Sequence, residues 1–176
     1  DSTNQWKRIY TNEGPLARRC HSMATTTDSA FPGAVILFGG LAHKSQQHQL
    51  TTTTTTLTQE HQYLKDLWLY HISKEIWTEL NPTGYKGGPI PSARAYQRLA
   101  KFTPDGYSTS LILMFGGRLS SGQDTNQTWV LELLVGATTT NNALPVTAVW
   151  YLVPVSSPAN SAPSSRTGHS MSSLGK

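Results

Sequence analysis

Short apolar runs separated by polar, glycine-rich and proline-rich stretches dominate this chain. The runs at residues 35–38 and 111–115 are each followed by a Gly-Gly pair, which predicts buried strands that stop at a glycine turn. Residues 76–80 alternate apolar and polar side chains, as in a strand with one covered face. No segment keeps a 3.6-residue period. The pattern therefore predicts an all-β fold.

The same landmarks recur in the same order along the chain. Three arginines open successive units, at separations of 76 and 72 residues. The Gly-Gly pairs lie 77 residues apart, and a tryptophan closes each of the two full units. Landmarks of different chemistry that repeat in one order indicate a true internal repeat. The landmark residues are Arg18, Gly39, Gly40, Trp77, Arg94, Gly116, Gly117, Trp150 and Arg166.

This repeat resembles that of the kelch family of β-propellers. The family's unit has an arginine before its first strand, a Gly-Gly pair closing the second, an aromatic residue in the third and a tryptophan in the fourth. Tyr70 and Trp129 supply the third-strand aromatic, and the match covers nearly the whole chain outside insertions. The resemblance implies a fragment of a kelch-type β-propeller with four-stranded antiparallel blades. The units exceed 70 residues, whereas kelch units are usually about 50 residues long.

The repeat also predicts how the chain is divided. Two blades alone would leave apolar faces in water, so we expect the remaining blades to come from the same longer chain. The excess length of the first unit falls in a polar, low-complexity insertion at 41–65, which includes six consecutive threonines. The expected parts are the end of a preceding blade (1–17), a first full blade (18–80), a linker loop (81–93), a second full blade (94–153) and the start of a further blade (154–176).

Most landmark residues are predicted to be structural. Glycine allows positive φ and close packing, and the Gly-Gly pairs lack the third glycine and Lys-Ser/Thr of a phosphate loop. The tryptophans Trp77 and Trp150 should pack between blades. The repeated arginines recur too regularly for specific partner contacts, so they are expected to hydrogen-bond between strands or blades.

The resemblance also points to a binding face. In kelch propellers that grip peptides, the face is formed by residues just after the repeat's arginine and just after its Gly-Gly pair. Carried over by position, this implies Arg19, Tyr96, Arg118 and Thr167 as partner-binding residues. Guanidinium groups recognise carboxylates and an aromatic ring adds contact area, so an acidic peptide is the expected guest. The alternative is that these are ordinary solvated residues.

Charge and hydropathy exclude two kinds of partner. The net charge is +4 and the pI is 9.3, but no run of five basic residues is present, so nucleic-acid binding is not expected. No apolar run approaches the roughly 18–20 residues that span a bilayer, so membrane insertion is not expected.

The compartment stays open between two weak signals. Cys20 is the single cysteine, which excludes an intrachain disulfide and slightly favours the cytoplasm. The sequon that begins at Asn126 supports a secreted protein or an ectodomain as the alternative.

No catalytic residue, metal site or cofactor is predicted. His43, His48 and His61 share the insertion, but their spacing matches no common zinc pattern. Cys20 and His21 are neighbours on a predicted strand and would point to opposite faces. The expected function is a protein–protein interaction module, a scaffold or adaptor. One alternative is part of an enzyme resembling galactose oxidase, with its site in blades not present, and a second is a structural subunit of a large assembly.

Overall fold

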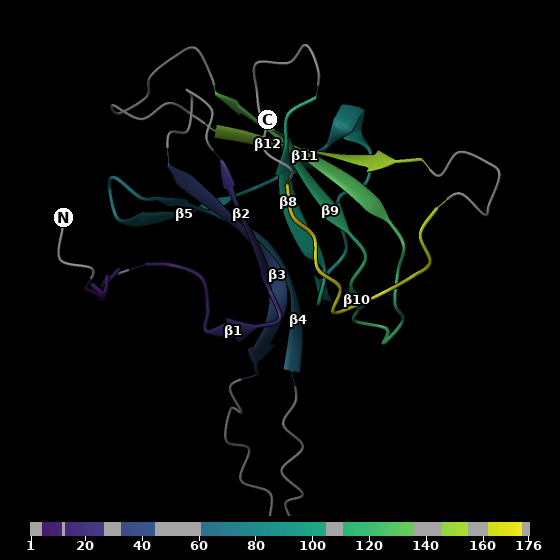
Figure 1. The fold of residues 1–176 in the computed structure, drawn as a ribbon, viewed down its shortest axis with the longest axis horizontal. Helices are drawn as coiled ribbons and strands as arrows, with labels where there is room; N and C mark the ends of the chain where they lie inside the picture. The colour runs from purple at the N-terminus through teal and green to yellow at the C-terminus, as the bar shows by residue number, and fades with distance from the viewer. Residues whose placement is uncertain are drawn as a thin grey trace, which may run out of the picture.

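The protein is an all-β molecule whose sheets are almost entirely antiparallel, as a computed structural model shows (Figure 1). The structure describes residues 5–11, 13–26, 33–44, 61–104, 111–135, 146–154 and 162–173. Within these ranges the only helical element is the short 3₁₀ turn η1 (Tyr85–Gly87), and no strands close into a barrel. The predicted all-β class is confirmed. None of the described helical structure is long or apolar enough to cross a membrane.

The first large sheet contains four strands that follow one another in sequence and in space. Each pairs antiparallel with the next, and a two-residue strand, β1 (Arg18–Arg19), pairs with the far end of the second of them. The four strands are β2 (Ser22–Thr26), β3 (Ala34–His43), β4 (His61–His71) and β5 (Ile76–Leu80).

The second large sheet repeats this order. Its four antiparallel strands are β8 (Arg98–Phe102), β9 (Leu111–Phe115), β11 (Thr128–Val135) and β12 (Val146–Val153). A short strand, β6 (Thr83–Gly84), adds to β12 in parallel, so part of the predicted linker loop 81–93 is strand and 3₁₀ turn. A separate pair, β7 (Arg94–Ala95) and β10 (Arg118–Leu119), takes the place that β1 and the end of β3 take in the first sheet.

Alternating burial explains how the two sheets pack. On β11 the side chains of Trp129, Leu131 and Leu133 are buried and those between them are not, because neighbouring residues of a strand face opposite sides. Trp150 of β12 packs edge-on against Phe38 of the first sheet, with ring centroids 5.4 Å apart. The core between the sheets comprises Ile36, Phe38, Leu67, Leu69, Leu80, Leu99, Ile112, Met114, Trp129, Leu131 and Trp150.

The first strands of the two sheets, β2 and β8, also lie side by side (Figure 1). The backbone N–H of Leu99 donates to Ser22 Oγ at 2.8 Å. The buried side chain of Gln97 donates Nε2 to the carbonyl oxygen of Phe38 at 2.8 Å. These two hydrogen bonds connect the sheets at the buried junction and help to fix their relative position, although Oε1 of Gln97 has no partner among the described residues.

Arg18 joins the second and third strands of the first sheet. Its Nη1 donates to the carbonyl oxygen of Gly39 at 3.1 Å, and its guanidinium binds both carboxylate oxygens of Asp66 at 2.6 Å. Trp68 Nε1 donates to the same carboxylate at 2.7 Å. Burial opposes ionisation of Asp66, but the hydrogen bonds from Arg18 and Trp68 outweigh it and hold the pKa of the carboxyl below its ordinary value.

Arg94 makes the equivalent contacts in the second sheet. Its Nη1 donates to the carbonyl oxygen of Gly116 at 3.2 Å and its Nη2 to Gln127 Oε1 at 2.7 Å. Trp129 Nε1 also donates to Gln127 Oε1, at 3.2 Å. Because Gln127 is neutral where Asp66 is charged, nothing offsets the burial of this guanidinium, and burial lowers the pKa of Arg94 to about 10.

Arg166 begins the same motif a third time. Its Nε and Nη2 bond to the carbonyl oxygen and hydroxyl of Ser164 at 3.1 and 3.2 Å. Arg94 bonds to Ser92 in the same way, at the same distances. Arg166 is exposed, whereas Arg94 is fully buried. Residues 162–173 form no strand, so this segment repeats the local motif without a sheet of its own.

The first glycine of each pair lies where two units touch through their backbones. Gly39 and Gly116 have φ values of +64° and +69°. A Cβ on Gly39 would lie 2.7 Å from the carbonyl oxygen of Arg94, and one on Gly116 would lie 2.6 Å from that of Arg166. Both the conformation and the close approach therefore require glycine.

The strands of the first sheet reach further into the predicted insertion 41–65 than the sequence indicated. β3 passes through its glycine pair with a register shift and ends at His43, and β4 already begins at His61. The pairing of β1 with this extension stabilises it, because it supplies a third strand. Residues 45–60 of the insertion, with the threonine run and His48, lie outside the described residues.

One further expectation needs correction. The counterpart of Trp129 is Trp68 and not Tyr70, because Trp68 and Trp129 bond to the equivalent residues before them. Tyr70 packs instead on Trp77, with ring centroids 4.9 Å apart. Residues 5–11, in the part assigned to a preceding blade, form no strand, and Trp6 is fully exposed.

Candidate functional site

Four residues chosen from the sequence gather at one end of the sheets. Arg19 lies on β1, Arg118 lies on β10, and Tyr96 directly follows β7. Arg19 and Arg118 both lie close enough to Tyr96 to interact with it electrostatically. Thr167 hydrogen-bonds to Asp124, which is the ion-pair partner of Arg118. We call the surface formed by Arg19, Tyr96, Arg118 and Thr167 the strand-end face.

A line of backbone hydrogen bonds brings this face together. The N–H of Tyr96 donates to the carbonyl oxygen of Cys20 at 2.9 Å, and the N–H of Gly168 donates to that of Tyr96 at 3.3 Å. The three residues occupy equivalent positions, two after the repeated arginine, and have φ values of +58°, +61° and +66°. Positive φ is uncommon for residues other than glycine. The left-handed turn is thus a shared feature of the three units.

Arg118 already has a carboxylate partner. Its Nε donates to Asp124 Oδ1 at 2.8 Å, across a pair of exposed side chains. This hydrogen bond raises the pKa of Arg118 and lowers the pKa of Asp124, which also bonds to Thr167. The pair is solvated and therefore weak, so an incoming carboxylate could share the guanidinium.

Arg19 has no carboxylate partner among the residues that the structure describes. Its Nη2 lies 2.7 Å from Nε2 of His61. A guanidinium can only donate, so this ring nitrogen accepts the hydrogen bond. The positive charge of Arg19 is therefore left uncompensated at an exposed position.

His61 belongs to a cavity that the sequence analysis missed. The cavity has a volume of about 210 Å³ and is lined by Ala17, Arg18, Arg19, Leu41, His43 and His61. We call it the histidine notch. The sequence analysis placed both histidines in the insertion 41–65, and residues 61–65 show no apolar–polar alternation that would have placed His61 on a strand.

Cys20 is paired with Tyr96 and not with its sequence neighbour His21. The hydrogen bond between the thiol and the phenol is the main cause that raises the pKa of Tyr96. Burial, followed by the nearby charge of Arg18, lowers the pKa of His21. Cys20 is a half-buried free cysteine.

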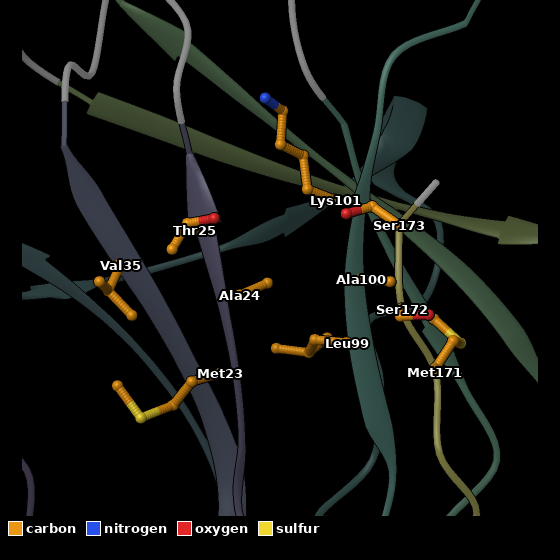
Figure 2. A pocket seen from close by; sticks show the side chains of 10 residues that line it. All are labelled: Met23, Ala24, Thr25, Val35, Leu99, Ala100, Lys101, Met171, Ser172 and Ser173. Atoms are coloured by element: carbon orange, nitrogen blue, oxygen red, sulfur yellow. The ribbon is translucent and has the colours of Figure 1, made fainter. Parts of the chain in front are cut away.

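A second cavity lies between the first strands of the two sheets. It has a volume of about 330 Å³. Figure 2 shows Ala24 of β2 and Leu99 of β8 pointing toward one another across it, with Met171 and Ser172 on the far side. Its lining is mostly small or apolar, and Lys101 is the charged side chain among the residues that line it. The arrangement offers little to orient a polar ligand.

The described ranges hold no cluster of three or more histidine, cysteine or acidic side chains that could bind a metal ion. The strand-end face instead combines two guanidinium groups and a phenol, which suits recognition of carboxylates. No protein-family model matches the chain, and a comparison with curated proteins gives no match either.

Proposed function

We propose that the chain is part of a kelch-type β-propeller that binds an acidic segment of another protein through its strand-end face. Support for the propeller comes from equivalent contacts in successive units. Arg18 and Arg94 bind the carbonyl oxygens of Gly39 and Gly116, and both glycines abut the next unit's arginine. Sheets of one strand order that touch through such contacts suit a radial array of blades.

The observation that carries the binding proposal is that two arginines lie close enough to Tyr96 to interact with it electrostatically. They come from different sheets, Arg19 from β1 and Arg118 from β10. The two arginines are exposed, and Tyr96 is half-buried. An aromatic residue near fork-shaped donors is typical of a surface that recognises acidic residues.

The proposal is tested with a peptide array. Acidic peptides rich in Asp and Glu are compared with counterparts in which these residues are Asn and Gln. The intact chain should prefer the acidic peptides, and the Arg19→Ala/Arg118→Ala variant should lose that preference. Lys74→Ala/Lys86→Ala removes the same charge elsewhere, at exposed lysines, and serves as the control.

The control variant should keep the wild-type pattern. If both double variants lose acidic peptides equally, net charge and not the strand-end face governs binding. Unchanged binding by Arg19→Ala/Arg118→Ala would contradict the proposed face directly.

A further inference from the structure

The histidine notch is built by cross-strand pairing. Arg19 of β1 lies opposite Leu41 of β3, which lies opposite Tyr63 of β4. Two residues along these strands, His43 lies opposite His61. Paired residues share a face of the sheet, as do residues two apart in one strand. One face therefore presents a guanidinium, two imidazoles and a phenol together.

The imidazole rings lie close enough to act on one small ligand. The ring centroids of His43 and His61 are 6.1 Å apart, and the rings are nearly perpendicular. The cavity of about 210 Å³ is many times the roughly 15 Å³ needed to hold one water molecule. The histidine notch thus provides both the space and the polar groups that a small ligand needs.

The charge balance of the notch is positive. The guanidinium of Arg18 also lines it, but it is 3% exposed and neutralised by Asp66. Arg19 has no such carboxylate within the described part of the chain, and the imidazole that it bonds carries no negative charge. The notch therefore carries one uncompensated positive charge.

A pair of histidines could bind either a metal ion or an anion, and the positive charge of Arg19 favours the anion. A metal ion bound at Nε2 of His61 would lie directly beside the guanidinium of Arg19, which is 2.7 Å from that nitrogen. Two like charges at such a distance repel strongly. Two imidazoles also fall short of the three or four ligands of most zinc sites. An anion is attracted by the guanidinium of Arg19.

We propose that the histidine notch binds the phosphoryl group of a phosphorylated serine or threonine in the partner segment. The guanidinium of Arg19 keeps N–H donors beyond the one directed at His61, and the imidazole of His43 can add another, so the notch can bind more than two acceptor oxygens. A phosphoryl group presents three strong acceptor oxygens and about two negative charges. This inference rests on the proposed function, since it names the group of the partner that enters beside Arg19.

The experiment follows the histidine rings by NMR. The Cε1–H resonances of His43 and His61 are assigned with the His43→Gln and His61→Gln variants of the full chain. Inorganic phosphate, N-acetyl-phosphoserine amide and acetate are titrated at pH 7, with chloride keeping the ionic strength constant. Both phosphates should shift the two resonances saturably, and acetate should bind at least tenfold more weakly.

Variants identify the group that holds the anion. Arg19→Gln should weaken phosphate binding at least tenfold, whereas Lys74→Gln, which removes a charge from the turn after β4, should leave it unchanged. Thermal unfolding of each variant checks that the fold is retained. Absence of a saturable shift, or an equal shift in Arg19→Gln, would overturn the proposal.

The remaining outcomes are equally decisive. Acetate binding as tightly as phosphate would assign the notch to carboxylates. Binding of inorganic phosphate without phosphoserine amide would rule out a phosphopeptide. If the array shows Arg19- and Arg118-dependent acidic binding while phosphate shifts neither ring, the notch proposal fails and the proposed function stands. If phosphate shifts both rings but the array shows no preference for acidic peptides, the proposed function fails and phosphate binding by the notch stands.

Discussion

The backbone N–H of Tyr96 lies 2.9 Å from the carbonyl oxygen of Cys20, and this hydrogen bond joins equivalent positions of two sheets. Gly168 repeats the contact by donating to Tyr96. The repeat therefore specifies the contacts between units as well as the similar sheets. The equivalent residue of each unit supplies a backbone donor or acceptor that connects it to its neighbour. The strand-end face forms on this connection.

Replacing Arg94 by Met should destabilise the protein by about 2–4 kcal/mol, because Gln127 and the carbonyl of Gly116 would lose a buried donor. Arg166→Met changes the same motif at an exposed position and should alter stability by at most about 0.5 kcal/mol. Urea unfolding measures both. An equal loss of unfolding free energy in the two variants would show that the burial of Arg94 adds nothing to stability.

Gly116→Ala and Gly122→Ala separate crowding from backbone strain. Both glycines have positive φ, at +69° and +83°, so each substitution should cost about 1–2 kcal/mol in conformation. A Cβ on Gly116 would lie 2.6 Å from the carbonyl oxygen of Arg166, whereas one on Gly122 meets nothing. Gly116→Ala should therefore be worse by about a further 1–3 kcal/mol. Urea midpoints that fall equally would contradict the close approach of the units.

Stability should fall as the pH is lowered from 7.5 to 5.5. Burial, assisted by nearby arginines, lowers the pKa of His21 and of His169, and burial together with Lys74 lowers that of His71. In the window below the ordinary histidine pKa of about 6.5, the unfolded chain binds more protons than the folded one. Protonation therefore favours unfolding in this range.

The second unit shows which residue can replace the histidines His21 and His169. Gln97 stands where His21 and His169 stand in the other units. His21→Gln/His169→Gln should show a weaker loss of the urea midpoint between pH 7.5 and 5.5, with His71 supplying the remaining slope. A slope equal to that of the wild type would show that these two rings are not the titrating groups.

A second loss of stability should appear in acid, near pH 4 and below. The pKa of Asp66 lies below its ordinary value despite burial, so its ionised contact with Arg18 stabilises the fold above the unfolded pKa of about 3.9. The contribution disappears as the pH falls through the folded pKa. Asp66→Asn should destabilise the protein by about 1–3 kcal/mol at pH 7. Its stability should then change less than that of the wild type between pH 5 and 3, as followed by urea unfolding.

Local signals in the sequence were enough to predict the class of fold and several strands. The apolar runs before each Gly-Gly pair became the strands β3 and β9, because an apolar run that ends at glycine carries its own burial and boundary signal. The glycine pair did not end β3, however. Continuation to His43 depended on pairing with β1 and β4, which a local pattern does not reveal.

The choice between Trp68 and Tyr70 shows the same limit. They are two residues apart on β4, so both fit an alternating strand equally well. Only the register, with Trp68 opposite Leu37 and Trp129 opposite Met114, identifies Trp68 as the repeated residue. Register follows from pairing between distant strands, and neither strand encodes it alone.

By itself, the sequence determined the all-β class and the repeated order of landmarks, because these properties depend on residue type and spacing. Arg19, Tyr96, Arg118 and Thr167 were chosen from the family resemblance. The tertiary structure decided that these residues share one face and that His43 and His61, separated by a polar insertion, meet beside Arg19. The physical reason is that a site assembled from several strands depends on backbone hydrogen bonds between segments far apart in the chain.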